Sequence, residues 1–148
     1  GVGLAIAAKK MGQDYRTYVL MGDGELAEGS IWESAMAAGH YKLDNLCAIV
    51  DRNHLQISGC TETVMTLEDL KGKWQMFGFE VIEIDGNNYE EIINAFTQAK
   101  AIKNKPSLIL ANTVKGKGVS FMENQASWHH GVLDAVQYKQ ALMELGDL

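Results

Sequence analysis

A chain of 148 residues, of which 47% are hydrophobic, is long enough to build one globular domain around a continuous core. Its 13 Lys and Arg residues stand against 19 Asp and Glu residues, which gives a formal net charge of -6, and the basic residues are scattered along the chain. Because nucleic acids and acidic membrane surfaces attract clustered positive charge, neither is an expected partner.

The two cysteines, Cys47 and Cys60, form no CxxC pair and lack metal-ligand spacing, which is typical of a reduced, cytoplasmic protein. No apolar stretch of the sequence approaches the length needed to span a bilayer. The chain starts at Gly1 rather than at an initiator Met, and residues 2–11 already predict a helix. We therefore expect residues 1–148 to form one domain that is incomplete at its N-terminus.

Helical periodicity alternates with short apolar runs along the chain, which predicts an α/β fold with a mostly parallel sheet flanked by helices. Ile31, Ala35, Ala38 and Gly39 place small residues on one helix face, which predicts close helix packing. Residues 115–132 predict a long loop, and such loops are usually functional or disordered. In chain order, the expected elements are helix 2–11, strand 17–21, helix 30–41, strand 46–50, helix 67–77, strand 79–84, helix 89–102, strand 107–113 and helix 134–145.

A glycine turn, Gly22-Asp23-Gly24, follows the first expected strand. Ligands of open parallel sheets bind at the carboxyl ends of strands, and glycine allows close approach to a phosphate, although an ordinary strand-to-helix turn has the same residues. With Ala27, the two glycines also satisfy a loose dinucleotide fingerprint. Asp23 argues against that function, because a carboxylate repels a bare pyrophosphate by about 4 kcal/mol at about 4 Å and an effective dielectric of about 20. The turn therefore predicts a cation between protein and phosphate.

The second expected strand ends in Asp51-Arg52-Asn53. If the first two strands are neighbours in the sheet, the amide oxygen of Asn53 faces the same ion as Asp23. Taken alone, an asparagine here is more often a turn residue that bonds its own backbone. Carboxylate and amide oxygens together with phosphates suit Mg²⁺.

The spacing of Asp23 and Asn53 is similar to the thiamine-diphosphate binding motif, in which GDG is followed some thirty residues later by Asn. The chain resembles the N-terminal, thiamine-diphosphate-binding section of transketolase over nearly its whole length. The resemblance is carried by the segments GDGELAEGSIWESAMAAGHYKLDNL, IVDRNHLQISG, KWQMFGFEVIEIDG and TVKGKGVSFMEN, and by a nearby SWH.

The resemblance implies roles for five residues around thiamine diphosphate and its Mg²⁺. Asp23, the side chain of Asn53 and the backbone carbonyl of Leu55 would bind the metal together with two diphosphate oxygens. Gly24 would present its N–H to the diphosphate. Ile57 falls where the family places a side chain against the thiazolium ring, and a plain core role is its alternative.

Three further positions match family residues near the reacting groups. Glu28 matches a glutamate at the subunit interface near the cofactor, and compensation of helix N-terminal charge is its alternative role. Lys115 matches a lysine near the cofactor, although a lone lysine in a glycine-rich loop is ordinarily solvated. His129, after Trp128, aligns with the histidine that contacts cofactor and substrate, and the adjacent His130 leaves the choice between the two histidines open.

The resemblance also implies a reaction and partners. The complete enzyme would transfer a two-carbon ketol unit from a ketose phosphate to an aldose phosphate, as in the pentose phosphate pathway. A pyrimidine-binding domain or C-terminal transketolase subunit would supply the activating glutamate, so the 148 residues would be inactive alone and would work in a homodimer or heterotetramer. Alternatives are a dihydroxyacetone synthase, a deoxyxylulose-phosphate synthase relative, or a noncatalytic assembly module of the same fold.

Overall fold

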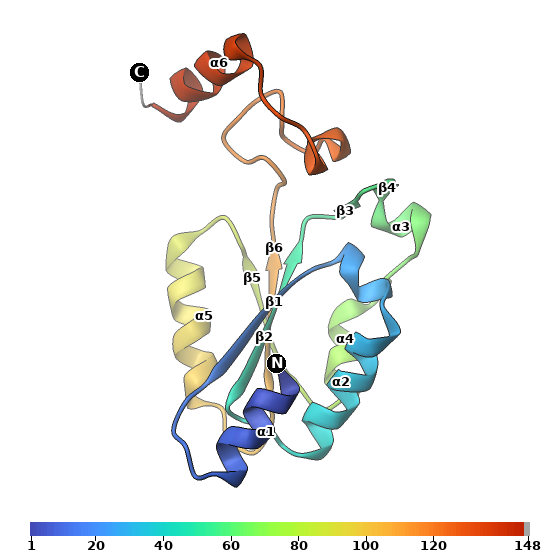
Figure 1. The fold of residues 1–148 in the computed structure, drawn as a ribbon, viewed down its shortest axis with the longest axis vertical. Helices are drawn as coiled ribbons and strands as arrows, with labels where there is room; N and C mark the ends of the chain where they lie inside the picture. The colour runs from blue at the N-terminus through green and yellow to red at the C-terminus, as the bar shows by residue number, and fades with distance from the viewer. Residues whose placement is uncertain (147–148) are drawn as a thin grey trace.

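Four parallel strands form the central sheet of the computed structural model, which describes residues 1–146 (Figure 1). The spatial order of the strands is β1-β2-β6-β5, and every neighbouring pair is parallel. The predicted mostly parallel sheet is therefore confirmed. The strands are β1 (Thr17–Gly22), β2 (Leu46–Arg52), β5 (Glu80–Asp85) and β6 (Ser107–Asn112).

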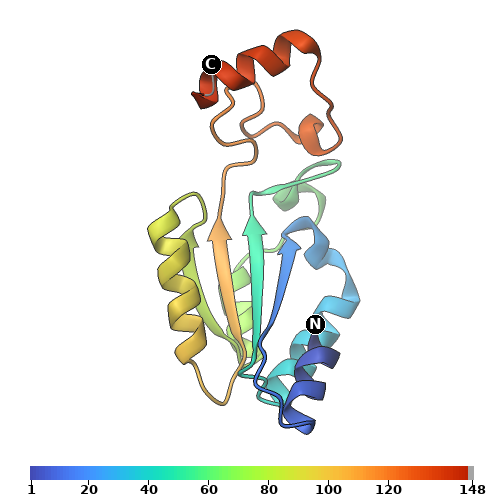
Figure 2. The same ribbon diagram turned by 60° about the vertical axis from the view of Figure 1, so that its left-hand side comes forward.

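Helices cover both faces of this sheet. The helices α1 (Val2–Lys10), α2 (Gly29–His40) and α4 (Leu70–Met76) share one hydrophobic core with the sheet, and α5 (Tyr89–Ala101) shares a second core with the opposite face. Figure 2 shows α5 and the α1–α2 side separated by the strands. Because both faces of the sheet's centre are covered, β2 and β6 are buried along most of their length, whereas the edge strands β1 and β5 are more exposed.

Side-chain caps define where two of the helices begin. The Asn88 side chain accepts hydrogen bonds from the backbone N–H groups of Glu90 and Glu91 at the start of α5. Asp134 forms a capping box with Gln137 at the start of α6 (Ala135–Leu145). A cap satisfies backbone donors that have no partner within the helix, so polar residues at these two positions stop the helix from extending backwards.

The expected close packing of α2 is present at Gly39. A Cβ atom added to Gly39 would lie 1.9 Å from the carbonyl oxygen of Phe77, which follows α4. Ala35 and Ala38 on the same helix are buried, with 2% and 0% of their surface exposed. Only glycine leaves room for the two backbones to approach so closely.

The predicted start of the helix at residue 67 is wrong by three positions, because α4 begins at Leu70. Asp69 caps this helix by accepting a hydrogen bond from the Gly72 N–H at 2.9 Å, and Glu68 has a positive φ of 46° that no right-handed helix allows. Leu67 is nevertheless buried, so its apolar side chain imitates helical periodicity without belonging to the helix.

Several short elements have no counterpart in the sequence-based prediction. They are the 3₁₀ turns η1 (Gly24–Ala27) and η2 (Ala126–His129), the antiparallel hairpin of β3 (Leu55–Gln56) and β4 (Gly59–Cys60), and the single-turn helix α3 (Thr61–Val64). Elements of two to four residues are too short to show a period. Figure 1 shows that the chain after β6 continues beyond the carboxyl ends of the strands, where η2 and α6 lie.

Candidate functional site

The predicted site lies where β1 and β2 end side by side. Gly22 of β1 pairs in register with Asp51 of β2, and the Asp23 N–H donates to the Asp51 carbonyl oxygen at 3.1 Å. The adjacency that the sequence interpretation required is therefore present. Parallel strands point their carboxyl ends to the same edge, so Asp23 and Asn53 emerge together there.

Asp23 is held by hydrogen bonds to both carboxylate oxygens and has only 1% of its surface exposed. Its Oδ1 accepts from the Gly24 N–H at 2.8 Å. Its Oδ2 accepts from Arg52 Nη1 at 3.1 Å and from the His54 N–H at 2.7 Å. A buried charge requires such partners, and Arg52 offsets the charge of the carboxylate.

Asn53 makes the local turn that its sequence context suggested. Its Oδ1 accepts from the Leu55 N–H at 3.0 Å, and its Nδ2 donates to Asp51 Oδ1 at 3.3 Å. An amide oxygen has two lone pairs, so this turn leaves Asn53 one further acceptor position. The turn and the proposed metal ligation are compatible.

A cavity of about 590 Å³ opens over this strand edge. It brings together all residues that the sequence predicted as metal or cofactor ligands, whereas Glu28 is not part of its lining. The volume falls within the roughly 300–1,000 Å³ typical of small-molecule sites. The lining residues are Gly22, Asp23, Gly24, Glu25, Asp51, Asn53, Leu55, Gln56, Ile57, Ser58, Lys115 and His129.

The Gly24 position is tight because the β3–β4 hairpin lies against it. A Cβ atom at Gly24 would be 2.5 Å from the Cβ of Gln56. The Gly24 N–H, expected to face a diphosphate, donates in this structure to Asp23 Oδ1. Ile57, at the tip of the same hairpin, has 66% of its surface exposed, so it is not a core residue in this chain.

The far wall of the cavity comes from the chain after β6. Lys115 is half-buried, and its carbonyl oxygen accepts from the Asn124 N–H at 2.9 Å. Gly116 follows with a φ of 72°, and a Cβ there would lie 2.6 Å from the Cβ of Met122, so glycine is needed for this turn. The expected loop at 115–132 is thus an ordered series of turns.

The two adjacent histidines occupy different positions. His129 ends η2 and lines the cavity, whereas His130 is not among the lining residues. Their rings pack edge to face with centroids 4.6 Å apart, and both are exposed. The Trp128 indole N–H donates to the Phe121 carbonyl at 3.0 Å and anchors the turn that presents His129.

Glu28 stands apart from the cavity at the N-terminal end of α2. Its side chain is exposed and makes no capping hydrogen bond to the helix. A carboxylate at this end interacts favourably with the helix dipole by about 0.3–1 kcal/mol. The geometry of this chain therefore accounts for Glu28 as a helix-end charge, and its expected role at a subunit interface stays a prediction.

Sequence reasoning missed Arg52, which is 7% exposed and joins Asp23 to the segment after the hairpin. Its Nη1 also donates to Thr61 Oγ1 at 3.0 Å, and its Nη2 donates to Glu62 Oε1 at 2.5 Å. The hydroxyl of Thr66 and the guanidinium of Arg52 lower the pKa of Glu62 to about 2. An arginine directly after the apolar run of β2 and Asp51 was the available signal, because such a charge is almost never buried without a partner.

The donor chemistry of the cavity fits Mg²⁺ and a diphosphate. The carboxylate of Asp23, the amide oxygen of Asn53 and the peptide carbonyl of Leu55 are hard oxygen donors, and Lys115 adds a positive charge. Within residues 1–146, no cluster of three or more His, Cys, Asp or Glu side chains is arranged to hold a metal. Mg²⁺ prefers one or two carboxylates together with phosphate oxygens, a set that Asp23 and a bound diphosphate would supply.

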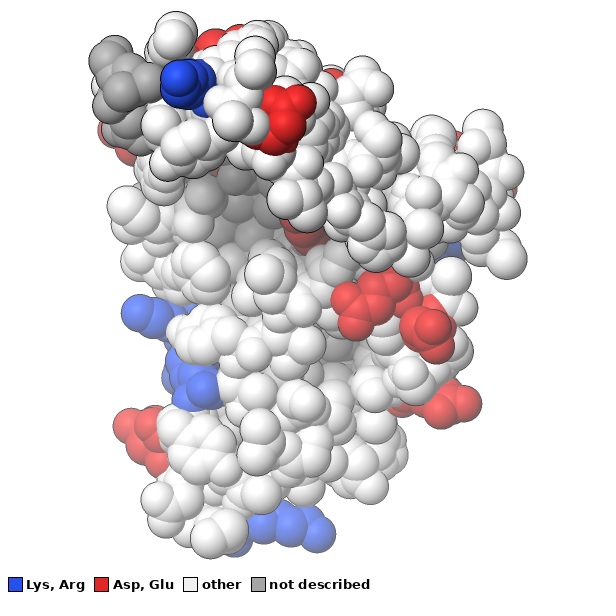
Figure 3. Space-filling model, turned by 45° about the horizontal axis from the view of Figure 1, so that its top comes forward, with Lys and Arg blue, Asp and Glu red and all other residues white. Residues whose placement is uncertain are grey.

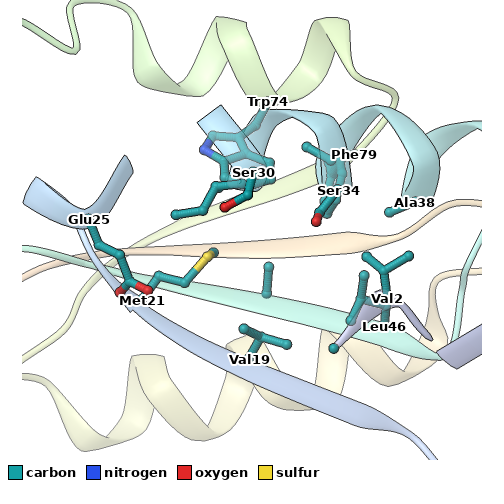
Figure 4. Close-up of a pocket in the computed structure, with 14 residues that line it drawn as sticks. Val2, Val19, Met21, Glu25, Ser30, Ser34, Ala38, Leu46, Trp74 and Phe79 are labelled. Atoms are coloured by element: carbon teal, nitrogen blue, oxygen red, sulfur yellow. The ribbon is translucent and has the colours of Figure 1, made fainter. Parts of the chain in front are cut away.

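The surface around this edge is hollowed. Figure 3, which brings this end of the molecule forward, shows a depression beneath the C-terminal segment, and Lys and Arg side chains lie at separate places on the face. A second, smaller cavity of about 180 Å³ lies between α1, α2 and the sheet (Figure 4). Val19, Leu46 and Phe79 are among its mainly apolar lining, and it contains no predicted site residue.

Fold and cavity together define a parallel α/β domain with a ligand-sized site at the carboxyl ends of adjacent strands. The profile of the family described as "Transketolase, thiamine diphosphate binding domain" matches residues 4–147. The chain belongs to this family. Membership favours the thiamine diphosphate interpretation of the glycine turn over the dinucleotide one.

Similar proteins and solved structures agree with this assignment. The chain is 55% identical over 147 residues to an apulose-4-phosphate transketolase subunit of Phocaeicola vulgatus, covering 99% of the chain and 52% of that protein. It is 46% identical over 144 residues to a 6-deoxy-6-sulfo-D-fructose transketolase subunit of a Clostridium species, covering 97% and 52%. A crystal structure of Campylobacter jejuni transketolase matches with a TM-score of 0.92 and 38% identity, covering 98% of this chain and 24% of that one.

The chain therefore spans about half the length of these two subunits. Among the helices of residues 1–146, none has the length and apolar character needed to cross a membrane.

Proposed function

We propose that this chain forms the Mg²⁺- and diphosphate-binding part of a transketolase-like enzyme, which transfers a two-carbon ketol unit from a ketose phosphate to an aldose phosphate. The observation that carries the proposal is the single cavity lined by Asp23, Asn53, Leu55, Lys115 and His129. Four separate segments of the chain meet there, so their convergence depends on the fold rather than on sequence proximity.

The metal ligands are Asp23, Asn53 and the carbonyl of Leu55. Asp23 is supported as a fixed ligand because two backbone N–H groups and Arg52 hold its carboxylate in one orientation. Asn53 is likewise restrained by its turn. Ligands held before binding lose little conformational entropy when the metal arrives.

Around the rest of the cofactor, the chain provides charge and apolar surface. Thiamine diphosphate, when bound, supplies a ring that accepts the electron pair of a carbanion. The ammonium of Lys115 is placed to attract the diphosphate, and the exposed side chain of Ile57 offers apolar surface to the ring. The Gly24 N–H donates to the diphosphate after its hydrogen bond to Asp23 Oδ1 has been broken.

His129 is the residue of this chain proposed to exchange a proton with a substrate oxygen. An imidazole titrates near neutral pH and can donate a hydrogen bond to a developing alkoxide. Its position on the cavity wall supports His129 over His130. Glu28 is proposed as part of a carboxylate network at the subunit interface, and its exposure on this chain leaves it accessible to a partner.

The active enzyme requires a pyrimidine-binding domain, contributed by a further segment or by a C-terminal subunit, in a homodimer or heterotetramer in the cytoplasm. Two relatives with about half their length covered are named as subunits, which supports a divided enzyme. They are named for different ketoses, one a phosphate and one a sulfonate. The shared feature is a ketose with an anionic end, consistent with the sugar phosphates proposed.

The proposal is tested by assaying ketol transfer with Mg²⁺ and thiamine diphosphate after the full-length chain has been combined with its partner subunit. Activity that is lost on chelation and restored by Mg²⁺ is the expected result. Metal-dependent cofactor binding without turnover would instead indicate a noncatalytic assembly module. Turnover with decarboxylation of a keto acid, in place of ketol transfer, would indicate a synthase of the deoxyxylulose-phosphate type.

A further inference from the structure

Arg52 is the one arginine in contact with the proposed metal ligands, and it lies at the end of β2 with almost no exposed surface. Its Nη1 lies 3.1 Å from Asp23 Oδ2. The other arginine, Arg16, lies before β1, at the opposite end of the sheet, and donates to the carbonyl oxygen of Ala99. Arg52 does not line the cavity, but among the described residues it is the cation whose ion pair with Asp23 the structure shows.

Arg52 does not face Asp23 alone. The Glu62 carboxylate lies 2.5 Å from its Nη2, and Thr61, with none of its surface exposed, accepts from its Nη1 at 3.0 Å. Glu62 is in turn held by the hydroxyl of Thr66 at 2.6 Å. The Arg52 guanidinium is thus shared between two carboxylates, the buried one of Asp23 at the cavity and the more exposed one of Glu62.

This arrangement has an electrostatic consequence for any cation that approaches Asp23. The buried carboxylate would be costly without a counter-charge, and Arg52 provides that charge in the absence of a metal. A divalent ion at Asp23 must then share the carboxylate with a guanidinium, and like charges at short range repel. The negative charge of a diphosphate offsets this repulsion.

We infer that Arg52 is a built-in counter-ion of the metal site, which keeps Asp23 and the 53–61 segment in place without metal and weakens the binding of a divalent ion on its own. The inference rests on the proposed function, since it concerns the same site. It makes Arg52 a positioning residue that contacts neither metal nor cofactor. If Arg52 acts in this way, Mg²⁺ binds tightly only together with a diphosphate.

The test measures the affinity of the full-length chain, in complex with its partner, for Mn²⁺ as a probe of the divalent site, by electron paramagnetic resonance of the free ion. Arg52→Met removes the positive charge and should bind Mn²⁺ about tenfold more tightly than wild type. Glu62→Gln removes the competing carboxylate, leaves the guanidinium to Asp23, and should bind Mn²⁺ about threefold more weakly. Arg52→Lys keeps the charge and should stay within threefold of wild type.

Tighter Mn²⁺ binding by Arg52→Met and weaker binding by Glu62→Gln distinguish a counter-ion from a merely structural residue. Loss of a merely structural residue could only weaken Mn²⁺ binding. Arg16→Met is the matched control, because it removes an arginine remote from the cavity and should leave Mn²⁺ affinity unchanged. Weaker or unchanged Mn²⁺ binding by Arg52→Met overturns the inference. If Arg52→Met does not fold, unchanged or tighter binding by Glu62→Gln overturns it in the same way.

The failure of the proposed function is recognised separately. The proposed function fails if the wild-type complex binds no thiamine diphosphate when Mg²⁺ is present. In the other outcome, the wild-type complex shows metal-dependent cofactor binding, but the variants do not shift Mn²⁺ affinity in opposite directions. This outcome refutes only the role of Arg52 and leaves the proposed function standing.

Discussion

The two walls of the cavity are built in different ways. At the ends of β1 and β2, Asp23 lines the cavity and forms an ion pair with Arg52, and both side chains are almost fully buried. On the facing wall, Lys115 is half-buried and His129 is exposed on a turn. The first wall is stabilised by buried charges, so changes there should affect stability and binding together. The second wall is anchored at the surface, so changes there should affect chemistry with little effect on stability.

The largest effect is expected from Asp23→Ala. The substitution removes a proposed metal ligand and leaves the Arg52 guanidinium without its buried carboxylate partner. Metal-dependent thiamine diphosphate binding should fall at least about 100-fold, and the free energy of unfolding should fall by about 3–5 kcal/mol. Calorimetric titration and urea unfolding measure the two changes.

Asp44→Ala is the control for this substitution, because Asp44 also pairs with a cation, Lys9, but both side chains are partly exposed. Its cost should stay within about 1 kcal/mol, and cofactor binding should not change. Metal-dependent binding by Asp23→Ala within threefold of wild type would remove Asp23 from the site.

The exposed wall is tested next by His129→Ala and His130→Ala. In the complex with the partner subunit, His129→Ala should lower kcat/KM by about 100-fold, the scale of a lost proton-transfer group, and His130→Ala by less than about threefold. Both proteins should unfold at the same urea concentration as wild type, because both side chains are exposed. The reverse order of activities would assign the role to His130.

Gly24→Ala tests the contact between the buried wall and the hairpin. The added methyl group would collide with Gln56 and should lower the free energy of unfolding by about 1–3 kcal/mol. Gly22→Ala is the matched control two residues away, because a Cβ there meets no atom within 4 Å. Equal unfolding midpoints for the two variants would show that the hairpin yields without cost.

The smallest effect is expected from the pH dependence at Glu62, whose pKa in the folded protein is lowered to about 2 by Thr66 and Arg52. A lowered pKa stabilises the fold above the unfolded value, 4.5, and this contribution is lost as pH falls towards 2. Glu62→Gln should therefore unfold at lower urea than wild type at pH 6, and the difference should shrink progressively below pH 4.5. A difference that does not vary with pH would contradict the proposed pairing.

Much of the fold follows from local patterns. The four strands were predictable because each is a short run rich in Val, Ile and Leu, and α5 was predictable because Asn88 and a long helical period mark its limits. The β3–β4 hairpin was not, since two-residue strands carry no period. The start of α4 was misjudged because Leu67 is buried for tertiary reasons.

The candidate site, like the fold, was predictable from the sequence only in its local features. The sequence alone placed Asp23 and Asn53 after apolar strands, because strand ends and glycine turns are local features. Only the tertiary structure decided that these strands are neighbours, that Arg52 pairs with Asp23, and that His129 rather than His130 lines the cavity. Pairing between residues distant in sequence depends on the packing of the whole sheet, and no local pattern encodes it.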